Sequence, residues 1–326
     1  MKALITGSTG FIGSHLTERL VEEGYTVKAL ARESSYVSLL KSLRVEIVYG
    51  NILDIDSVEK AVSGCEIVYH LAARTSHHAS WLKQEDYAVN VEGVRNLADA
   101  SLRAKVGRFV YGSSAGVYGF IKDSPVDEKT KPTPNNHYRK SKLLGENLVR
   151  SLHKKEGLPV VIARISSVYG PRSLNWLGLF QSIATKRFRM IGSGENHVHL
   201  GYVSDIVDGL RGCADKADIE GECYIISGKE PIKLKQFVDM IAEELGISIS
   251  SARSPEFPFR VYNDIAAFIY RRSGLELPRV GTYELFLEDR ILSNSKAEKE
   301  LGYDPKVSVK EGIQRTVKWY RENGFL

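Results

Sequence analysis

Short apolar, β-branched runs alternate with longer helical patterns over the first two thirds of the 326-residue chain, and this alternation constrains the fold most. Several runs are apolar at consecutive positions, as expected where both faces of a sheet are covered. Helices between the runs make repeated strand–helix–strand units, which build an α/β, doubly wound parallel sheet. We predict seven strands, at residues 2–6, 25–30, 45–49, 66–72, 108–113, 159–165 and 222–227. Ligands of such sheets bind beyond the carboxyl ends of the strands.

The alternation stops after Pro171, which indicates a second, smaller lobe. We predict that residues 1–172 form the sheet domain and that residues 201–227 return to it. Residues 173–200 and 228–326 then form the substrate-binding lobe and the closing helices. The turn around Gly170 joins the two parts, and we expect it to act as a hinge between them.

The charge of the chain is too mild and too mixed to indicate a nucleic-acid partner. It carries 45 Lys and Arg against 40 Asp and Glu, a formal net charge of +5, without an arginine stripe.

Cys65, Cys213 and Cys223 form no CxxC pair, which indicates reduced thiols in a cytoplasmic protein. No apolar run approaches the roughly 20 residues of a membrane span. We expect a small-molecule substrate, no nucleic acid and no membrane span.

Two pairs of histidines raise the question of a metal site. His197 and His199 alternate on one face of a short strand-like segment, and His77 and His78 lie in the loop after the fourth predicted strand. Neither pair is followed by a third ligand at a useful spacing. We therefore expect no metal.

A glycine-rich turn follows the first predicted strand and opens a helix. Gly7, Gly10 and Gly13 stand at GxxGxxG spacing, with Phe11 and Ile12 between the last two. The first glycine allows a tight turn, the second lets a pyrophosphate approach the backbone, and the third lets the helix pack closely. Free N–H groups and the dipole at the helix N-terminus favour the anion. The turn predicts a dinucleotide bound to a Rossmann-type sheet, in contact with these residues.

The end of the second strand bears on the choice between NADP and NAD. Binding of the ribose hydroxyls requires an acidic residue there, but the strand is followed by Ala31 and Arg32, and Glu33 comes one residue later. An arginine can pair with a 2′-phosphate, although Arg32 could also stack on adenine or be solvated. We expect NADP, with NAD as the alternative. Asn51 and Ile52 follow the third strand and are placed to cap the adenine ring.

Tyr138 and Lys142 stand four residues apart at the start of a long predicted helix, so their side chains share one face. Bringing a tyrosine pKa from about 10 to ~7 requires about 4 kcal/mol of preference for the phenolate. A lysine ammonium and a positive nicotinamide ring can supply it together. Ser113 and Ser114 end the fifth strand, where a hydroxyl can hydrogen-bond a substrate oxygen. With the glycine turn, these residues predict a hydride-transfer site.

Five motifs occur in order, TGSTGFIG, HLAA, SSAGVYG, YRKSK and YGP, and NSKAEKELGYDPKVSVKEGIQRTVKWY lies near the C-terminus. With this set the chain resembles the extended short-chain dehydrogenase/reductase family, which includes NAD(P)-dependent epimerases and dehydratases. Its tail is similar to the sterol-dehydrogenase, dihydroflavonol-reductase and sugar-epimerase branches. The resemblance implies that Tyr138 carries the proton, that Lys142 holds the nicotinamide ribose and lowers the tyrosine pKa, and that Ser114 completes the catalytic set. It also implies cofactor contacts from Leu71, Ala72, Ala73, Asn90, Ile165 and Ser167.

The resemblance also bears on the reaction. Dehydratases of the family carry an Asp-Glu pair directly after the hydroxyl residue, where this chain has Ala115 and Gly116. Nucleotide-sugar enzymes usually have an arginine at Val198 and an asparagine at Asn175, so one of two anchors is missing. We expect an oxidoreductase acting at a secondary alcohol or ketone carbon, with substrate contacts from Ser114, Tyr138 and Asn175. A nucleotide-sugar epimerase with tightly bound NAD is the alternative, and a catalytically silent NADP sensor is a third possibility.

Two further helical patterns indicate packing surfaces. An aromatic-rich segment carries apolar residues at helical spacing: Phe259, Tyr262, Ala266 and Ile269. They favour a helix packed on the sheet domain, or else an apolar wall for a lipid-like substrate or a contact with a membrane surface. Helices predicted at 83–104 and 138–156 carry apolar stripes, including Leu144, Leu148 and Leu152. Two copies could pair these helices, so we expect a homodimer.

Overall fold

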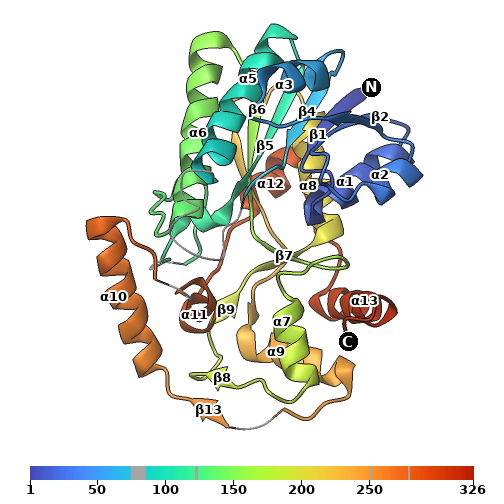
Figure 1. Ribbon diagram of the computed structural model, residues 1–326. Coiled ribbons are helices and arrows are strands. Elements are labelled where there is room, and N and C mark those ends of the chain that lie inside the picture. Colours follow the sequence, from blue (N-terminus) through green and yellow to red (C-terminus); the bar gives the residue numbers. More distant parts are fainter. Residues whose placement is uncertain (75–85, 122–123, 250–251, 278–279) are drawn as a thin grey trace.

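The computed structural model describes residues 1–74, 86–121, 124–249, 252–277 and 280–326. Its centre is a seven-stranded, fully parallel sheet in the order β11-β6-β5-β4-β1-β2-β3 (Figure 1). The predicted α/β, doubly wound architecture is confirmed, and each of the seven predicted strands occurs in this sheet. The strands are β1 (Lys2–Thr6), β2 (Thr26–Ala31), β3 (Glu46–Tyr49), β4 (Ile67–His70), β5 (Arg108–Ser114), β6 (Val160–Ile165) and β11 (Cys223–Ile226).

Helices cover both faces of the sheet, which explains why its strands are apolar at consecutive positions. Leu4 and Ile5 of β1 are both fully buried, but each joins the hydrophobic core of a different face. One face is covered by α1 (Phe11–Glu22) and α8 (Val203–Asp215), and α2 (Ser38–Ser42) lies beside α1. The other face is covered by α3 (Ile55–Val62), α5 (Gly93–Arg103) and α6 (His137–Glu156).

A separate hydrophobic cluster lies beyond the carboxyl edge of the sheet, in the lower half of Figure 1. Phe180, Phe237 and Tyr320 are fully buried in it. Its helices are α7 (Leu177–Ala184), α9 (Leu234–Leu245), α11 (Val280–Leu287) and α13 (Val309–Glu322), with α10 (Phe257–Ser273) outside α11. By contrast, α12 (Ser295–Leu301) packs on β11 and α8.

Three short two-stranded pairs complete this part of the chain. β7 (Ser167–Tyr169) pairs in parallel with β10 (Leu200–Tyr202), and β8 (Met190–Ile191) pairs in parallel with β13 (Arg253–Ser254). β9 (His197–Val198) pairs with β12 (Ile232–Lys233) in antiparallel orientation. Among the described helices, none is both long enough and apolar enough to cross a membrane.

The turn between β7 and the following segment is tied to α1, the helix that the glycine turn opens. Gly170 has φ +141°, which favours glycine, and a Cβ there would lie 2.7 Å from Val203 Cγ1. The next residue, Pro171, has its carbonyl 2.9 Å from His15 Nε2, and Arg172 Nη1 donates to Glu18 Oε1 at 3.0 Å. Contacts from α1 therefore hold the crossing from the sheet into the rest of the chain.

Candidate active site

Two of the predicted catalytic side chains meet at the carboxyl edge of the sheet. Ser114 is the last residue of β5, and its Oγ accepts a hydrogen bond from the Gly116 N–H at 3.0 Å. The Tyr138 phenol, at the start of α6, lies near enough to the same hydroxyl for Ser114 to favour the charged form and lower the pKa of the phenol. Asn136 caps this helix, because its Oδ1 accepts from the Arg139 N–H at 2.8 Å. The cap fixes the first turn of α6 and thereby the phenol.

The neighbouring Ser113 points to the opposite face of the sheet. Its hydroxyl is buried and donates to Glu146 Oε1 at 2.6 Å. Glu146 also accepts from Arg164 of β6, at 3.0 Å from Nε and 2.8 Å from Nη2. Ser113 therefore belongs to a buried ion pair that joins β5, β6 and α6, and only Ser114 faces the site. Alternation along a strand is the signal that separates the two serines.

Lys142 lies one turn after Tyr138 and is buried. Its Nζ is 4.7 Å from the centre of the Tyr111 ring, a cation–π contact. Burial lowers the pKa of Lys142 to about 8, although the Glu146 carboxylate acts in the opposite direction. The side chain is therefore still mostly charged at neutral pH.

The environment of Tyr138 differs from the sequence-based expectation. Burial raises the pKa of its phenol, and the groups that oppose burial are the Ser114 hydrogen bond and the Arg139 charge. Lys142 is not among them in this structure, so the protein alone does not bring the phenol toward neutrality. Arg139 had no predicted role, although it lies inside the YRKSK motif.

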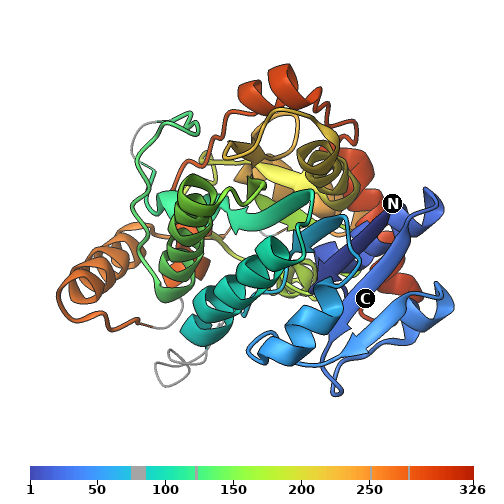
Figure 2. The same ribbon diagram turned by 90° about the horizontal axis from the view of Figure 1, so that it is seen from above.

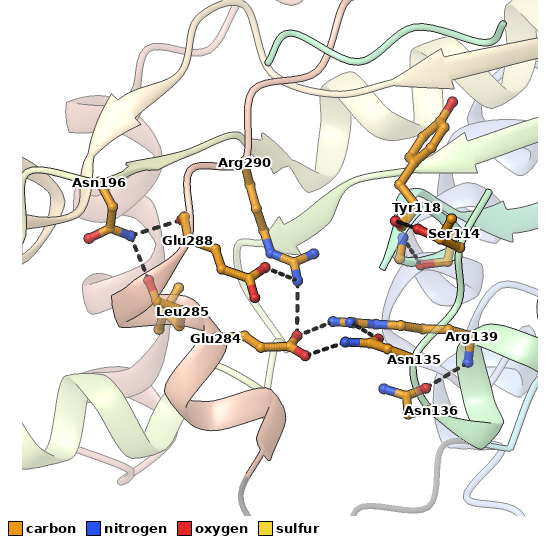
Figure 3. A network of polar contacts seen from close by, with 12 residues as sticks. Ser114, Tyr118, Asn135, Asn136, Arg139, Asn196, Glu284, Leu285, Glu288 and Arg290 are labelled. Atoms are coloured by element: carbon orange, nitrogen blue, oxygen red, sulfur yellow. Dashed lines mark hydrogen bonds and ion pairs between the residues drawn. The ribbon is translucent and has the colours of Figure 1, made fainter. Parts of the chain in front are cut away.

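Figure 3 shows how Arg139 is held beside the site. Its Nη2 donates to Glu284 Oε2 of α11 at 2.6 Å, and its Nη1 donates to Asn135. Asn135 donates in turn to Glu284 Oε1 at 2.8 Å, and Arg290 Nη2 donates to Glu284 Oε2 at 2.9 Å. Glu284 is almost fully buried, yet Arg139 and Arg290 outweigh the effect of burial and lower its pKa. This carboxylate ties α11 to the first turn of α6.

Arg139 also fills space next to the serine. A Cβ added at Gly116 would lie 3.2 Å from Arg139 Cγ and 3.3 Å from its Nε. An acidic side chain at Gly116 would therefore compete with Arg139 for the same room. The sequence shows that no carboxylate follows Ser114, and the structure shows which side chain occupies the space.

Asn90 connects the loop after β4 to α6. It lies in a π-helical turn (Ala88–Glu92), a rare conformation that recurs at functional sites. Its Nδ2 donates to the Arg74 carbonyl and to Ser141 Oγ, both at 2.9 Å, and its Oδ1 accepts from the Arg74 N–H at 2.8 Å. Ser141 donates to the Tyr138 carbonyl at 2.7 Å. Asn90 therefore links the loop after β4 to the first turn of α6.

The glycine turn fits a dinucleotide phosphate. Gly7 has φ +77°, and a Cβ there would lie 2.7 Å from the Ala72 N atom. A Cβ at Gly13 would lie 2.1 Å from the Gly7 carbonyl oxygen, so α1 packs directly on the turn. No side chain caps α1, and its first turn, from Phe11 and Ile12 onward, carries no acidic residue. The Ser8 hydroxyl is buried without a partner among the described residues. The turn therefore presents free donors and a positive helix end to an anion.

The other predicted cofactor residues lie along the same edge of the sheet. Leu71 and Ala72 are half-buried and Ala73 is exposed after β4, and the Ala72 N–H donates to Thr6 Oγ1 at 3.3 Å. Four more predicted cofactor residues lie at the ends of other strands: buried Ile165 ends β6 and exposed Ser167 begins β7, and exposed Asn51 and buried Ile52 follow β3. Arg32 is exposed one residue past β2, with Glu33 beside it.

Three predictions concern residues farther from Ser114 and Tyr138. Asn175 is exposed just before α7. His199 is buried, with Nε2 at 2.8 Å from the Gly228 carbonyl and Nδ1 accepting from the Leu292 N–H, whereas His197 pairs with Asp289. His77 and His78 lie outside the described residues.

The predicted packing of the aromatic-rich helix on the sheet domain is wrong. Phe259 and Tyr262 of α10 contact Tyr283 of α11, with ring centres 4.8 and 5.7 Å apart. Only the C-terminal end of α10 reaches α6, where the Gly274 carbonyl lies 2.7 Å from His137 Nε2. The periodicity identified the inner face of the helix but not its partner.

Comparisons with known proteins identify the family to which the chain belongs. The model of the "NAD dependent epimerase/dehydratase family" matches residues 3–226. The chain is 29% identical to 3beta-hydroxysteroid-dehydrogenase/decarboxylase isoform 2 of Arabidopsis thaliana, over 96% of this chain but only 61% of that protein's length. It is 30% identical to the dTDP-D-glucose 4,6-dehydratase of Homo sapiens, over 99% of this chain and 90% of that protein.

Solved structures show the same architecture. The UDP-glucose 4-epimerase of Thermotoga maritima with UDP-glucose matches with a TM-score of 0.81 and 26% identity, over 99% of both chains. The UDP-glucuronic acid 4-epimerase of Bacillus cereus with UDP-glucuronic acid and NAD matches with a TM-score of 0.81 and 26% identity. The match to this second epimerase covers 99% of this chain and 100% of that one.

Proposed function

Because the chain belongs to the NAD-dependent epimerase/dehydratase family of extended short-chain dehydrogenases/reductases, we propose that it transfers a hydride at a secondary alcohol or ketone carbon. The chain is an enzyme of this family. The observation that carries the proposal is the placement of Ser114, at the end of β5, beside Tyr138, at the start of α6, on the sheet edge that also bears the glycine turn.

Each of the three proposed catalytic residues has a physical task. Ser114 donates a hydrogen bond to the substrate oxygen and stabilises negative charge that develops on it. Tyr138 exchanges a proton with the same oxygen. Lys142 supplies a buried positive charge one helical turn away and holds the nicotinamide ribose. A bound nicotinamide supplies the hydride acceptor or donor, and in its oxidised form a second positive charge.

Dehydration is the least supported of the family's reactions here. Ala115 and Gly116 offer no group that can move a proton, and Arg139 fills the space beside Gly116. The 30% identity to a dehydratase extends over the whole chain, but it does not supply those two acidic residues.

We propose NADP as the cofactor, with exposed Arg32 as the partner of a 2′-phosphate. Gly7, Gly10 and Gly13 would receive the pyrophosphate, with Phe11 and Ile12 at the positive end of α1. The remaining cofactor contacts are assigned to Asn51, Ile52, Leu71, Ala72, Ala73, Ile165 and Ser167. NAD is the alternative, since a structural neighbour binds it.

We assign the substrate to residues 173–200 and 228–326, with Asn175 as one contact. We also propose a homodimer through α5 and α6, which lie side by side on one face of the sheet (Figure 2). Leu144 and Leu148 are half-buried there, whereas Leu152 is in the core. A cytosolic location is supported by the three cysteines, each a buried free thiol.

The first experiment identifies the nucleotide that freshly purified protein releases on denaturation. An oxidoreductase exchanges its cofactor in every cycle, so we expect an empty site that binds NADPH reversibly, followed by turnover in an alcohol and ketone screen. Tyr138→Phe should abolish that turnover and leave NADPH binding intact. A cellular activity that survives Tyr138→Phe would instead favour the NADP sensor.

Nucleotide-sugar epimerisation is the second candidate, and the two epimerase structures favour it. An epimerase restores its cofactor in each cycle and can retain it. Near-stoichiometric release of NAD would therefore support epimerisation and count against Arg32 as a phosphate partner.

A further inference from the structure

The outer face of α10 carries an apolar stripe that no described part of the chain covers. Four of its side chains are exposed, Phe257 by 75%, Val261 by 39%, Ile265 by 51% and Phe268 by 57%. We call these four residues the outer stripe. Figures 1 and 2 show α10 at the margin of the molecule, away from the central sheet.

The spacing of the outer stripe is that of one helix face. Successive members are four, four and three residues apart, so they form a continuous row along a helix about 25 Å long. The opposite face of α10 is already used, because Phe259 and Tyr262 pack against Tyr283 of α11. A helix on the surface of a globular protein normally exposes its polar face. Here both faces are apolar, and the outer one has no partner within the described chain.

The charges on α10 are mostly positive. Arg271 and Arg272 are exposed at its C-terminal end, whereas exposed Arg260 pairs with Glu256, the residue before the helix, and Asp264 is the one acidic residue within it. The Arg272 guanidinium lies 5.6 Å from the centre of the Phe268 ring, so positive charge directly borders the stripe. Exposed apolar side chains flanked by arginine are the pattern of a helix that lies in a membrane interface, where anionic headgroups attract the arginines.

A second copy of the chain is a poorer partner for this face. Two stripes placed together would bring the arginines of both copies into one interface, since a twofold contact pairs the same surface with itself. One row of four side chains is also narrow for a stable protein interface, which buries about 1,200–2,000 Å² in total. We propose that α10 docks the protein on an anionic lipid surface.

Docking would place the active site close to the lipid. His137 directly precedes Tyr138, and its ring packs on Tyr270 of α10 with ring centres 5.2 Å apart. The C-terminal end of α10 therefore lies at the head of the helix that carries the proposed catalytic tyrosine. The docking proposal itself does not depend on the reaction, and its test uses no turnover.

The test is co-sedimentation of the full chain with vesicles of phosphatidylcholine, alone or mixed with phosphatidylglycerol. We expect partitioning onto the mixed vesicles that is at least about tenfold stronger than onto phosphatidylcholine, and that weakens with added salt. The double variant Ile265→Ser/Phe268→Ser should lose partitioning by about tenfold or more. Arg271→Gln/Arg272→Gln should lose the preference for the anionic lipid.

Ile55→Ser is the matched control, because Ile55 is 53% exposed but lies on α3. It should partition like the unmodified chain. Equal partitioning of the control and the stripe variant would overturn the proposal, and so would failure of the unmodified chain to bind either vesicle. Self-association that depends on concentration and disappears in the stripe variant would show a second copy as the occupant instead. Thermal unfolding confirms that each variant is folded.

Discussion

At the scale of single residues, two adjacent serines have different tasks. Ser113 is buried against Glu146, and Ser114 faces Tyr138. Ser113→Ala should lower the free energy of unfolding by about 1–2 kcal/mol and leave turnover nearly intact. Ser114→Ala should leave stability nearly intact and reduce kcat by about 10²-fold. Urea unfolding and steady-state kinetics on the two variants check this, and equal effects on both quantities would contradict the assignment.

Arg139 should influence the pH dependence of catalysis. Its charge opposes the rise in the pKa of Tyr138, so Arg139→Gln should raise that pKa further. The phenolate is the base in oxidation and the phenol is the acid in reduction. The limb of the pH–rate profile that reports Tyr138 should therefore move to higher pH, both for oxidation and for reduction.

Arg150→Gln is the control for Arg139, because Arg150 lies three turns farther along α6, where it donates to the Gly221 carbonyl. It should leave the limb where it is. An unmoved limb in Arg139→Gln would restrict Arg139 to a structural role.

At the scale of elements, the docking of α11 on α6 places two glutamates in opposite electrostatic situations. Burial raises the pKa of Glu288 to about 7, against the pull of Arg290. Folded protein therefore keeps a proton that unfolded protein releases between about pH 4.5 and 7, and stability from this group falls as the pH rises through that window. Glu288→Gln should stabilise the protein at pH 8 by about 1–2 kcal/mol and have little effect at pH 4.

Glu284 provides the opposite sign. Arg139 and Arg290 outweigh burial and lower its pKa, so its contribution to stability is present above the unfolded pKa and is lost as the pH falls. Glu284→Gln should therefore destabilise the protein at pH 8. Urea unfolding at pH 4 and pH 8 measures both variants, and a shift of the same sign in both at pH 8 would contradict the two environments.

The same elements show how far sequence reasoning reaches. The sheet could be predicted strand by strand, because burial on both faces leaves a local apolar pattern. The glycine turn and the Tyr138–Lys142 spacing are local too. Glu284 could not be predicted, since it reaches Arg139 across 145 residues and no spacing relates them. The periodicity of α10 gave its inner face, but the exposure of the opposite face depends on what packs nearby.

At the scale of the whole molecule, the crossing at Gly170 should couple the sheet to the part of the chain that we propose binds the substrate. Gly170 has φ +141°, and a Cβ there would meet Val203. Gly170→Val or Gly170→Ala should therefore displace the turn that Arg172 ties to Glu18 of α1.

The glycine turn lies at the N-terminal end of α1, before Glu18, and it keeps its own contacts. We therefore expect kcat to fall by about tenfold or more in Gly170→Ala, while the Kd for NADPH changes less than about threefold. Gly178→Ala is the control, because Gly178 lies in α7 with open space around it, and alanine is the better helix former there. Steady-state kinetics and fluorescence titration with NADPH measure the two quantities. Equal loss of kcat and of cofactor affinity would mean that the turn supports the cofactor site itself, and would rule out a hinge that acts on the substrate side.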